Sequence, residues 1–150
     1  KIYRNCTPII NARFCNLYGP TPLERYDLIH VLTRKLLDHG KAELWNTAPS
    51  RDFIYVEDLA RAHTAVLGLS GLQYFNVGSE TGSKMIDVVL EITGIAGYDV
   101  PIDDLGERAG DVPANYASSQ KLSAATGWRA QEGLRDGLER TVEWFRGRSS

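Results

Sequence analysis

The sequence predicts an α/β fold with short strands, on the basis of three observations. Apolar segments of strand length alternate with segments whose apolar residues have helical spacing. Turn-forming residues separate these segments. Hydrophobic residues make up 43% and charged residues 24% of the chain, as is ordinary for a globular domain with a core. No repeat, low-complexity segment or internal linker divides the sequence, so residues 1–150 are expected to form a single domain.

The first third of the chain predicts a strand, a helix and a second strand. Residues 8–17 (PIINARFCNL) form an apolar run typical of a buried strand, which the Tyr-Gly-Pro turn at 18–20 closes. Residues 23–38 place their apolar side chains at helical spacing, and Gly40 is expected to cap this helix. Residues 42–45 predict a further short strand.

The middle third predicts two more strands around a helix. Residues 52–56 (DFIYV) follow a loop at 46–50 and have the composition of a strand. Asp58 comes next and heads the helix at 59–69. Its carboxylate is expected to cap the first free amides of that helix or to pack against the helix dipole. Residues 73–77 (QYFNV) predict the next strand.

The last third is expected to be mostly helical. Ser83 is expected to cap a helix over 84–93. A short strand is expected at 98–102, and the polar stretch 103–115 is expected to be a surface loop. Two further helices are predicted over 118–126 and 133–146.

The predicted sheet is thin for such apolar strands. Residues 8–17 and 73–77 are apolar on both faces, and strands of this kind usually have neighbours and helices on each side. This mismatch predicts that part of a larger sheet is missing. The chain also begins at Lys1 rather than at methionine, which suggests a fragment, although processing or tag removal would leave the same start.

The charge balance argues against two classes of partner. The formal net charge is −2, so no broad positive field is available to hold nucleic acid or an anionic membrane. No apolar run reaches transmembrane length, and the N-terminus lacks the core of a signal peptide. Cys6 and Cys15 are not needed as a disulfide in a chain of this size, so a reduced, cytoplasmic setting is expected. The histidines have no metal-ligand spacing, and no metal is expected.

Five motifs follow one another in a familiar order and spacing. They are RFCNLYGP at 13–20, SRDFIYVEDLARAH at 50–63, YFNVGS at 74–79, ERAGD at 107–111, and SSQKLSAATGWRA at 118–130 continued by GLRDGLERTVEWF. The series resembles that of the extended short-chain dehydrogenases/reductases, which include the NAD-dependent sugar-nucleotide epimerases and dehydratases. The resemblance covers most of residues 8–145, and the chain is identified as a member of this family on that basis.

The resemblance implies that this chain is the C-terminal, substrate-binding part of a Rossmann-type enzyme. In the family, an N-terminal half binds NAD or NADP and carries a Tyr-x-x-x-Lys pair for proton transfer. Neither that pair nor a glycine-rich dinucleotide loop occurs in this sequence, so the NAD-binding half is expected to be absent. The strands at 8–17 and 73–77 would belong to its sheet. No catalytic residue is predicted, and the chain alone is expected to bind no cofactor and to be inactive.

The resemblance also implies four substrate-binding residues. Asn16 takes the place of an asparagine that contacts the diphosphate of a nucleotide sugar. Arg51 and Arg108 take the places of two diphosphate-binding arginines, whose planar guanidinium groups suit phosphate oxygens. Asp111 matches an acid that accepts hydrogen bonds from ribose hydroxyls.

The residues taken by themselves leave other roles open. Asn16 could serve the turn that follows it. Arg51 could pair with Asp52 or Asp58, and Arg108 could be a solvated loop charge.

Two further positions match the nicotinamide end of the cofactor site in the family. These are Phe14 and Cys15, for which plain core packing is an equal alternative. Besides a short loop after Pro20, the family pattern is broken in two places. A Gly-Asp-Gly turn is usual before Arg51, where this chain has Asn-Thr-Ala-Pro-Ser at 46–50, and Ala109 replaces a proline.

The expected function is the substrate-binding portion of an NAD(P)-dependent nucleotide-sugar epimerase, dehydratase or reductase, clamping the diphosphate and the ribose. By family, the parent enzyme is an isomerase, lyase or oxidoreductase. The alternative is a standalone, non-catalytic nucleotide-sugar-binding or interaction module that has lost the Rossmann half. A nucleotide-diphospho-sugar is the expected ligand, and the exposed strand at 8–17 predicts self-association.

Overall fold

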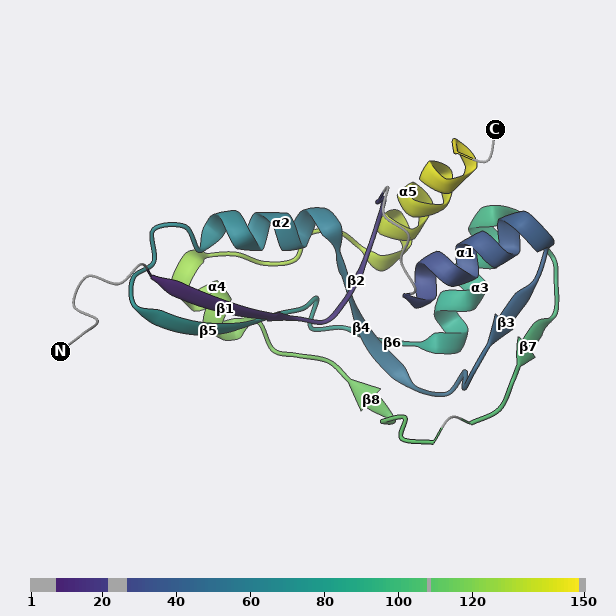
Figure 1. Ribbon diagram of the computed structural model, residues 1–150, viewed down its shortest axis with the longest axis horizontal. Coiled ribbons are helices and arrows are strands. Elements are labelled where there is room, and N and C mark those ends of the chain that lie inside the picture. Colours follow the sequence, from purple (N-terminus) through teal and green to yellow (C-terminus); the bar gives the residue numbers. More distant parts are fainter. Residues whose placement is uncertain (1–7, 22–26, 108, 149–150) are drawn as a thin grey trace.

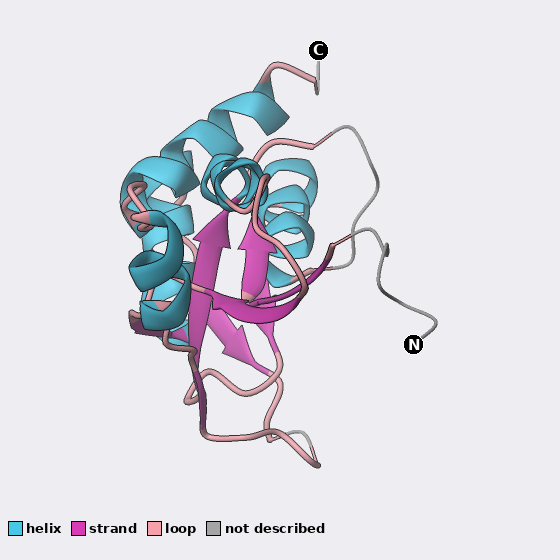
Figure 2. Cartoon of the chain, turned by 90° about the vertical axis from the view of Figure 1, so that its left-hand side faces the viewer, coloured by secondary structure: helices cyan, strands magenta, loops and turns pink. Residues whose placement is uncertain are grey.

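The α/β class is confirmed by a computed structural model, which describes residues 8–21, 27–107 and 109–148. Strands and helices follow one another in the order ββαββαββαββαα. Figure 1 shows them spread along one long axis, with groups of helices toward its two ends and strands running between them. In the view turned by 90°, most helices lie above the strands and the longest loops lie at the bottom (Figure 2).

One end of the molecule is built on a parallel strand pair. Strand β1 (Ile9–Phe14) pairs with β5 (Leu72–Val77) in a continuous register, and helices α2 (Val56–Ala65) and α4 (Gln120–Thr126) flank this pair. Both helices pack on the same face of the pair, which we call its inner face. Its side chains include Ile10, Ala12, Phe75 and Val77.

The predicted strand at 8–17 is divided between two sheets. It pairs with β5 as far as Phe14, and the Cys15 amide still donates to the Val77 carbonyl at 3.1 Å. Strand β2 (Asn16–Tyr18) then pairs with β4 (Ser50–Tyr55) instead. The prediction of a single strand over 8–17 was therefore wrong, because the pairing partner changes from β5 to β4 at Cys15 although the apolar run continues.

Strand β4 is the centre of the second sheet. Its second half lies parallel to β2, and its first half pairs with β6 (Gly82–Lys84) and β8 (Ala114–Asn115). Three consecutive β4 residues, Phe53, Ile54 and Tyr55, are buried. Adjacent strand residues point to opposite faces, so β4 supplies apolar side chains to both sides.

The other end of the molecule is a helical layer with a short strand pair. Helices α1 (Leu28–His39), α3 (Met85–Ala96) and α5 (Leu134–Arg146) pack together beside β3 (Ala42–Leu44) and β7 (Ile102–Asp104), which are parallel to each other. The predicted cap of α1 is confirmed. Gly40 has a φ of 61° and donates to the Leu36 carbonyl, which glycine allows at little cost.

Two separate clusters of buried side chains result. The closed core lies among α1, α3, α5, β3 and β4, and it includes Leu36, Phe53, Val88, Ile92 and Leu138. The open core lies under α2 and α4, and it includes Ile54, Leu59, Phe75, Leu122 and Trp128. Phe53 and Ile54 are neighbours in β4 but belong to different clusters, so this strand joins the two cores.

Several local expectations were wrong. Ser83 does not cap α3; it pairs with Arg51 in the β4–β6 ladder, and the N-cap position is Lys84. The strand expected at 98–102 begins only at Ile102, and part of the expected loop over 103–115 forms β8. Each error concerns a short strand whose partner is distant in the chain and leaves no local pattern.

Asp58 also differs from expectation in its role as a cap. It is fully buried in the first turn of α2, but its two oxygens accept from the backbone amides of Gln131 and Glu132, each at 2.9 Å. Arg61 donates to the same carboxylate at 2.6 Å. Asp58 therefore joins α2 to the segment that precedes α5.

The two helices expected at the end of the chain are confirmed as α4 and α5. Among the helices of the described residues, none has the length and apolar character needed to cross a membrane.

Candidate functional site

Three of the four predicted substrate-binding residues line one cleft. It has a volume of about 410 Å³ and lies between β4, α1 and the loops that follow β3 and β7. Asn16, Arg51 and Asp111 come from three segments that are far apart in the chain. Arg108 lies outside the described residues. The structure thus brings together the three positions that it describes, while their role in substrate binding stays a prediction.

Arg51 is anchored by the loop across from β4. Its Nη1 donates to the carbonyl of Val112 at 2.8 Å and to that of Ser50 at 2.9 Å. Its Nη2 lies 3.9 Å from Asp111 Oδ1, and its side chain is 18% exposed. A guanidinium carries five N–H donors in a planar fork. The three contacts therefore leave it capacity to bind a ligand oxygen in the cleft.

The pairings of Arg51 that the sequence left open, with Asp52 or Asp58, are not the ones that form. Asp52 is fully buried and accepts from the Ser79 amide at 2.9 Å, the Ser79 hydroxyl at 2.7 Å and the Glu80 amide at 3.3 Å. Asp58 is held by the segment before α5. Both carboxylates thus organise backbone instead of neutralising Arg51.

Asp111 lines the cleft from the loop between β7 and β8. Its side chain is 32% exposed, and Oδ2 accepts from the Asn46 side-chain amide at 3.3 Å. Oδ1 faces Arg51. A carboxylate offers about four acceptor positions on its two oxygens, so both contacts can persist while a ligand hydroxyl donates to it.

Asn16 stands at the start of β2, where the chain leaves the first sheet. Its side-chain amide donates to the Asp52 carbonyl at 3.0 Å. This bond fixes the side chain against β4, on the same wall of the cleft as Arg51. An amide NH₂ has two donor hydrogens, so the bond to β4 does not prevent a second bond to a ligand oxygen.

Phe14 and Cys15 stand at the carboxyl end of β1. Phe14 is 50% exposed, so core packing within the described residues does not account for its position. The thiol of Cys15 is partly buried, and its pKa is raised to about 12 by burial and, in smaller measure, by the negative charge of Asp52. The Cys15 thiol is therefore protonated at neutral pH, and the Phe14 side chain has no ionisable group. The carboxyl ends of parallel strands are where open α/β sheets place ligands.

Sequence reasoning missed Asp52 as a residue that organises the site. It also receives a bond from the Ala117 amide at 3.4 Å, so one carboxylate holds two loops and faces Cys15. A charged residue inside an apolar strand such as DFIYV was the available signal, because a buried carboxylate must find partners.

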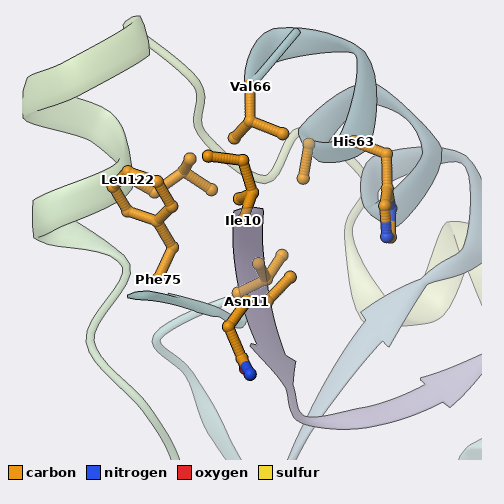
Figure 3. A pocket seen from close by; sticks show the side chains of 9 residues that line it. Ile10, Asn11, His63, Val66, Phe75 and Leu122 are labelled. Atoms are coloured by element: carbon orange, nitrogen blue, oxygen red, sulfur yellow. The ribbon is translucent and has the colours of Figure 1, made fainter. Parts of the chain in front are cut away.

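A second cavity, of about 370 Å³, lies in the open core and contains none of the predicted site residues. Figure 3 shows Ile10, Val66, Phe75 and Leu122 around it, with Asn11 and His63 as its polar members. His63 Nδ1 lies 2.8 Å from the Leu59 carbonyl. The walls are mainly aliphatic, so this cavity lacks the groups that would hold a phosphate. The described residues also contain no group of three or more potential metal ligands.

The fold is α/β, and its cleft brings together an amide and a guanidinium from the starts of β2 and β4 and a carboxylate from the loop before β8. Comparison with known proteins gives the family. The sequence profile of the NAD dependent epimerase/dehydratase family matches residues 3–78, and the chain belongs to this family.

Relatives of known function agree with this assignment. The chain is 30% identical over 148 residues to dTDP-glucose 4,6-dehydratase 1 of Escherichia coli, covering 92% of this chain and 41% of the relative. It is 32% identical over 146 residues to GDP-L-fucose synthase 1 of Arabidopsis thaliana, covering 87% of this chain and 43% of the relative. The chain thus spans less than half the length of these two relatives.

Solved structures of related enzymes contain the same fold over nearly all of this chain. UDP-glucose 4-epimerase of Thermotoga maritima, determined with UDP-glucose, superimposes with a TM-score of 0.87 at 26% identity, over 94% of this chain and 47% of that one. The Thermus thermophilus UDP-glucose 4-epimerase complex with NAD gives a TM-score of 0.82 at 28% identity, over 93% and 47%. The similarity covers nearly all of this chain and about half of each enzyme.

Proposed function

We propose that the chain binds the nucleoside-diphosphate part of a nucleotide-diphospho-sugar and forms the substrate-binding portion of an NAD(P)-dependent epimerase, dehydratase or reductase. One observation carries the proposal: Asn16, Arg51 and Asp111 line the same cleft although they are distant in sequence. An amide, a guanidinium and a carboxylate together match the chemistry of a diphosphate joined to a ribose.

Each side chain has a distinct role in this proposal. Arg51 binds the diphosphate through the N–H donors that are not already bonded to the Val112 carbonyl. Asn16 donates to a phosphate oxygen without adding charge. Asp111 accepts from a ribose hydroxyl, where its negative charge is farther from the phosphates. Fixing the nucleotide at several points holds the sugar in one place relative to the reacting groups of the parent enzyme.

The cofactor of the parent is NAD or NADP, which supplies hydride transfer when it is bound. Phe14 and Cys15 fit a position beside its nicotinamide, because both are uncharged and stand at the carboxyl end of a parallel strand. They would contribute an apolar wall that excludes water. We expect the chain alone to show no turnover and no stoichiometric NAD binding.

Isothermal titration calorimetry with UDP, dTDP and GDP tests the proposal. We expect the chain to bind at least one of them and Arg51→Ala to weaken that binding by about 1.5–3 kcal/mol, the usual value of a hydrogen bond to a charged group. Arg13→Ala is the matched control, since Arg13 lies on β1 over the Tyr74 ring and does not line the cleft. Asp111→Asn is expected to have a smaller effect.

Two results would contradict the proposal. One is the absence of binding for all three nucleotides. The other is a wild-type affinity in Arg51→Ala, which would leave the family membership intact and remove the diphosphate assignment.

A further inference from the structure

We infer that Asn46 is the positioning residue for the Asp111 carboxylate and thereby sets how strongly the cleft distinguishes a ribose hydroxyl. The inference rests on the proposed function, because it assigns a determinant to the same nucleotide site. It depends on a hydrogen bond between the loops that follow β3 and β7, both of which contribute residues to the cleft.

The backbone of Asn46 is held in an uncommon conformation. It has a φ of 55°, in the left-handed region that asparagine tolerates better than most residues with a side chain. Its backbone amide donates to the Gly106 carbonyl at 2.9 Å, which continues the contact between β3 and β7 into their loops. The left-handed turn directs the chain from β3 toward Pro49 and the start of β4.

Both ends of the Asn46 side chain have partners. Oδ1 accepts from the Ala48 amide at 3.3 Å, and Nδ2 donates to Asp111 Oδ2 at 3.3 Å. These partners determine the orientation of the amide, since a backbone N–H requires an acceptor and a carboxylate requires a donor. Asn46 therefore presents its NH₂ group to Asp111 in a fixed direction.

The contact matters because Asp111 lies in a loop that exposes most of its neighbours. Residues 109–116 are all exposed, so local packing does little to fix the carboxylate. Asn46 holds Oδ2 from one side, and Arg51 approaches Oδ1 to 3.9 Å from another. Ordering a side chain before the ligand arrives removes part of the entropy cost of binding.

Another contact joins the loop after β3 to the last residue of β7 without touching Asp111. The hydroxyl and the backbone amide of Thr47 donate to Asp104 Oδ2 at 2.6 Å and 3.3 Å. Asp104 also accepts from the Gly106 amide at 2.9 Å. Thr47 thus supports loop structure but not the carboxylate itself, and it provides a matched control.

The experiment compares affinities for paired nucleotides by calorimetry. UDP or GDP, whichever the wild-type chain binds more tightly, is titrated beside its 2′-deoxy and 3′-deoxy analogues. Asn46→Gly keeps the left-handed backbone and removes the amide; Asn46→Asp keeps the shape and replaces the donor by a second carboxylate. Thr47→Val removes the hydroxyl bond to Asp104, and Asp111→Asn removes the negative charge of the positioned group.

We expect the wild-type chain to prefer the full ribose over at least one analogue by roughly tenfold, as for one hydrogen bond to a charged group. Both Asn46 variants should lose most of that preference, and Thr47→Val should retain it. A merely structural role would weaken binding of all nucleotides equally and leave the preference unchanged.

The outcomes separate the two proposals. If the wild-type chain binds UDP and GDP but Asn46→Gly keeps the ribose preference, the role of Asn46 is wrong and the proposed function stands. The role of Asn46 is also wrong if Thr47→Val loses the preference as fully as Asn46→Gly does, or if wild type shows no preference for the full ribose. If the wild-type chain binds none of UDP, GDP and dTDP, both proposals are overturned; if it binds dTDP alone, only the role of Asn46 is overturned.

Discussion

The closed core and the open core contain the same kinds of element but differ in how completely their apolar residues are covered. In the closed core, Leu36, Val88 and Leu138 have no exposed surface. Ile54 and Leu122 of the open core are also unexposed, but the β1–β5 pair beside them leaves Ile9 60% and Leu72 59% exposed on its outer face. A cavity of about 370 Å³ also lies on its inner side.

The difference shows that an apolar strand sequence favours a buried position, but that burial also requires helices to cover both faces of the strand. Strands β1 and β5 have an inner face under α2 and α4, while no helix within the described residues covers their outer face. Closure of the other core comes from three helices that meet beside β4. The two regions should therefore respond differently to matched substitutions.

The largest expected effect is the loss of a leucine from the closed core. Leu138→Ala should lower the free energy of unfolding by about 4 kcal/mol, within the range for buried leucines. Leu122→Ala, equally unexposed but beside the cavity of the open core, should cost about 2 kcal/mol, because fewer contacts remain to be lost there. Urea unfolding followed by circular dichroism measures both, and equal losses would show that the two cores are packed alike.

A somewhat smaller effect is expected where the two regions are joined. Asp58→Ala leaves the amides of Gln131 and Glu132 without their acceptor and should cost about 2–3 kcal/mol. The matched change Glu57→Ala breaks an exposed ion pair with Arg140 and should cost at most about 1 kcal/mol. Unfolding is followed by tryptophan fluorescence and circular dichroism, since Trp128 donates to the Asp58 carbonyl. Equal free energies of unfolding for the two variants would show that Asp58 does not stabilise the contact between α2 and the segment before α5.

The uncovered face predicts a change in association with little change in stability. Ile9→Lys should alter the free energy of unfolding by less than about 0.5 kcal/mol, as is usual for surface positions. It should also shift a self-associating chain toward monomer, because a charged side chain opposes pairing at a sheet edge. The control is Leu67→Lys, at a position 77% exposed just after α2, which should not change the association state.

Size-exclusion chromatography with light scattering across concentration decides this case. A strictly monomeric wild-type chain, with strongly protected amides at 8–17, would show that the uncovered face does not drive association.

The smallest effect at neutral pH concerns Cys15, between the two sheets. Because the thiol pKa is raised from 9.0 to about 12, the thiolate fraction at pH 8 should be lower by about 1,000-fold, and alkylation correspondingly slow. Asp52→Asn should speed it by removing a negative charge. The folded chain holds this proton when the unfolded chain has lost it, so stability should fall as pH rises from about 9 toward 12.

Mass spectrometry of the Cys6→Ser variant isolates the reaction of Cys15. A rate at pH 8 equal to that of the urea-unfolded chain would contradict the raised pKa.

Much of the helical structure could be predicted from the sequence. Apolar spacing and a terminal glycine act within a few residues, so the end of α1 at Gly40 and the spans of α4 and α5 follow from local chemistry. The short strands β7 and β8 could not be placed in this way. Their hydrogen bonds go to residues of β3 and β4 that are far away in the chain.

The site shows a similar division. The motifs selected Asn16, Arg51 and Asp111, but the 3.9 Å approach of Arg51 to Asp111 and the bond from Asn46 depend on how the loops meet. The sequence showed that residues 46–50 replace the family's usual Gly-Asp-Gly turn, without showing that Asn46 reaches Asp111.

The sequence by itself determined the α/β class, the family and the positions of the longer helices, because periodicity and motif spacing are local properties of the chain. The tertiary structure alone decided that the apolar run at 8–17 divides between two sheets, and that Asp52 and Asp58 hold distant backbone amides. The physical reason is that a buried carboxylate or a strand edge must find hydrogen-bond partners. The folded chain, not the neighbouring sequence, determines which groups are near enough to provide them.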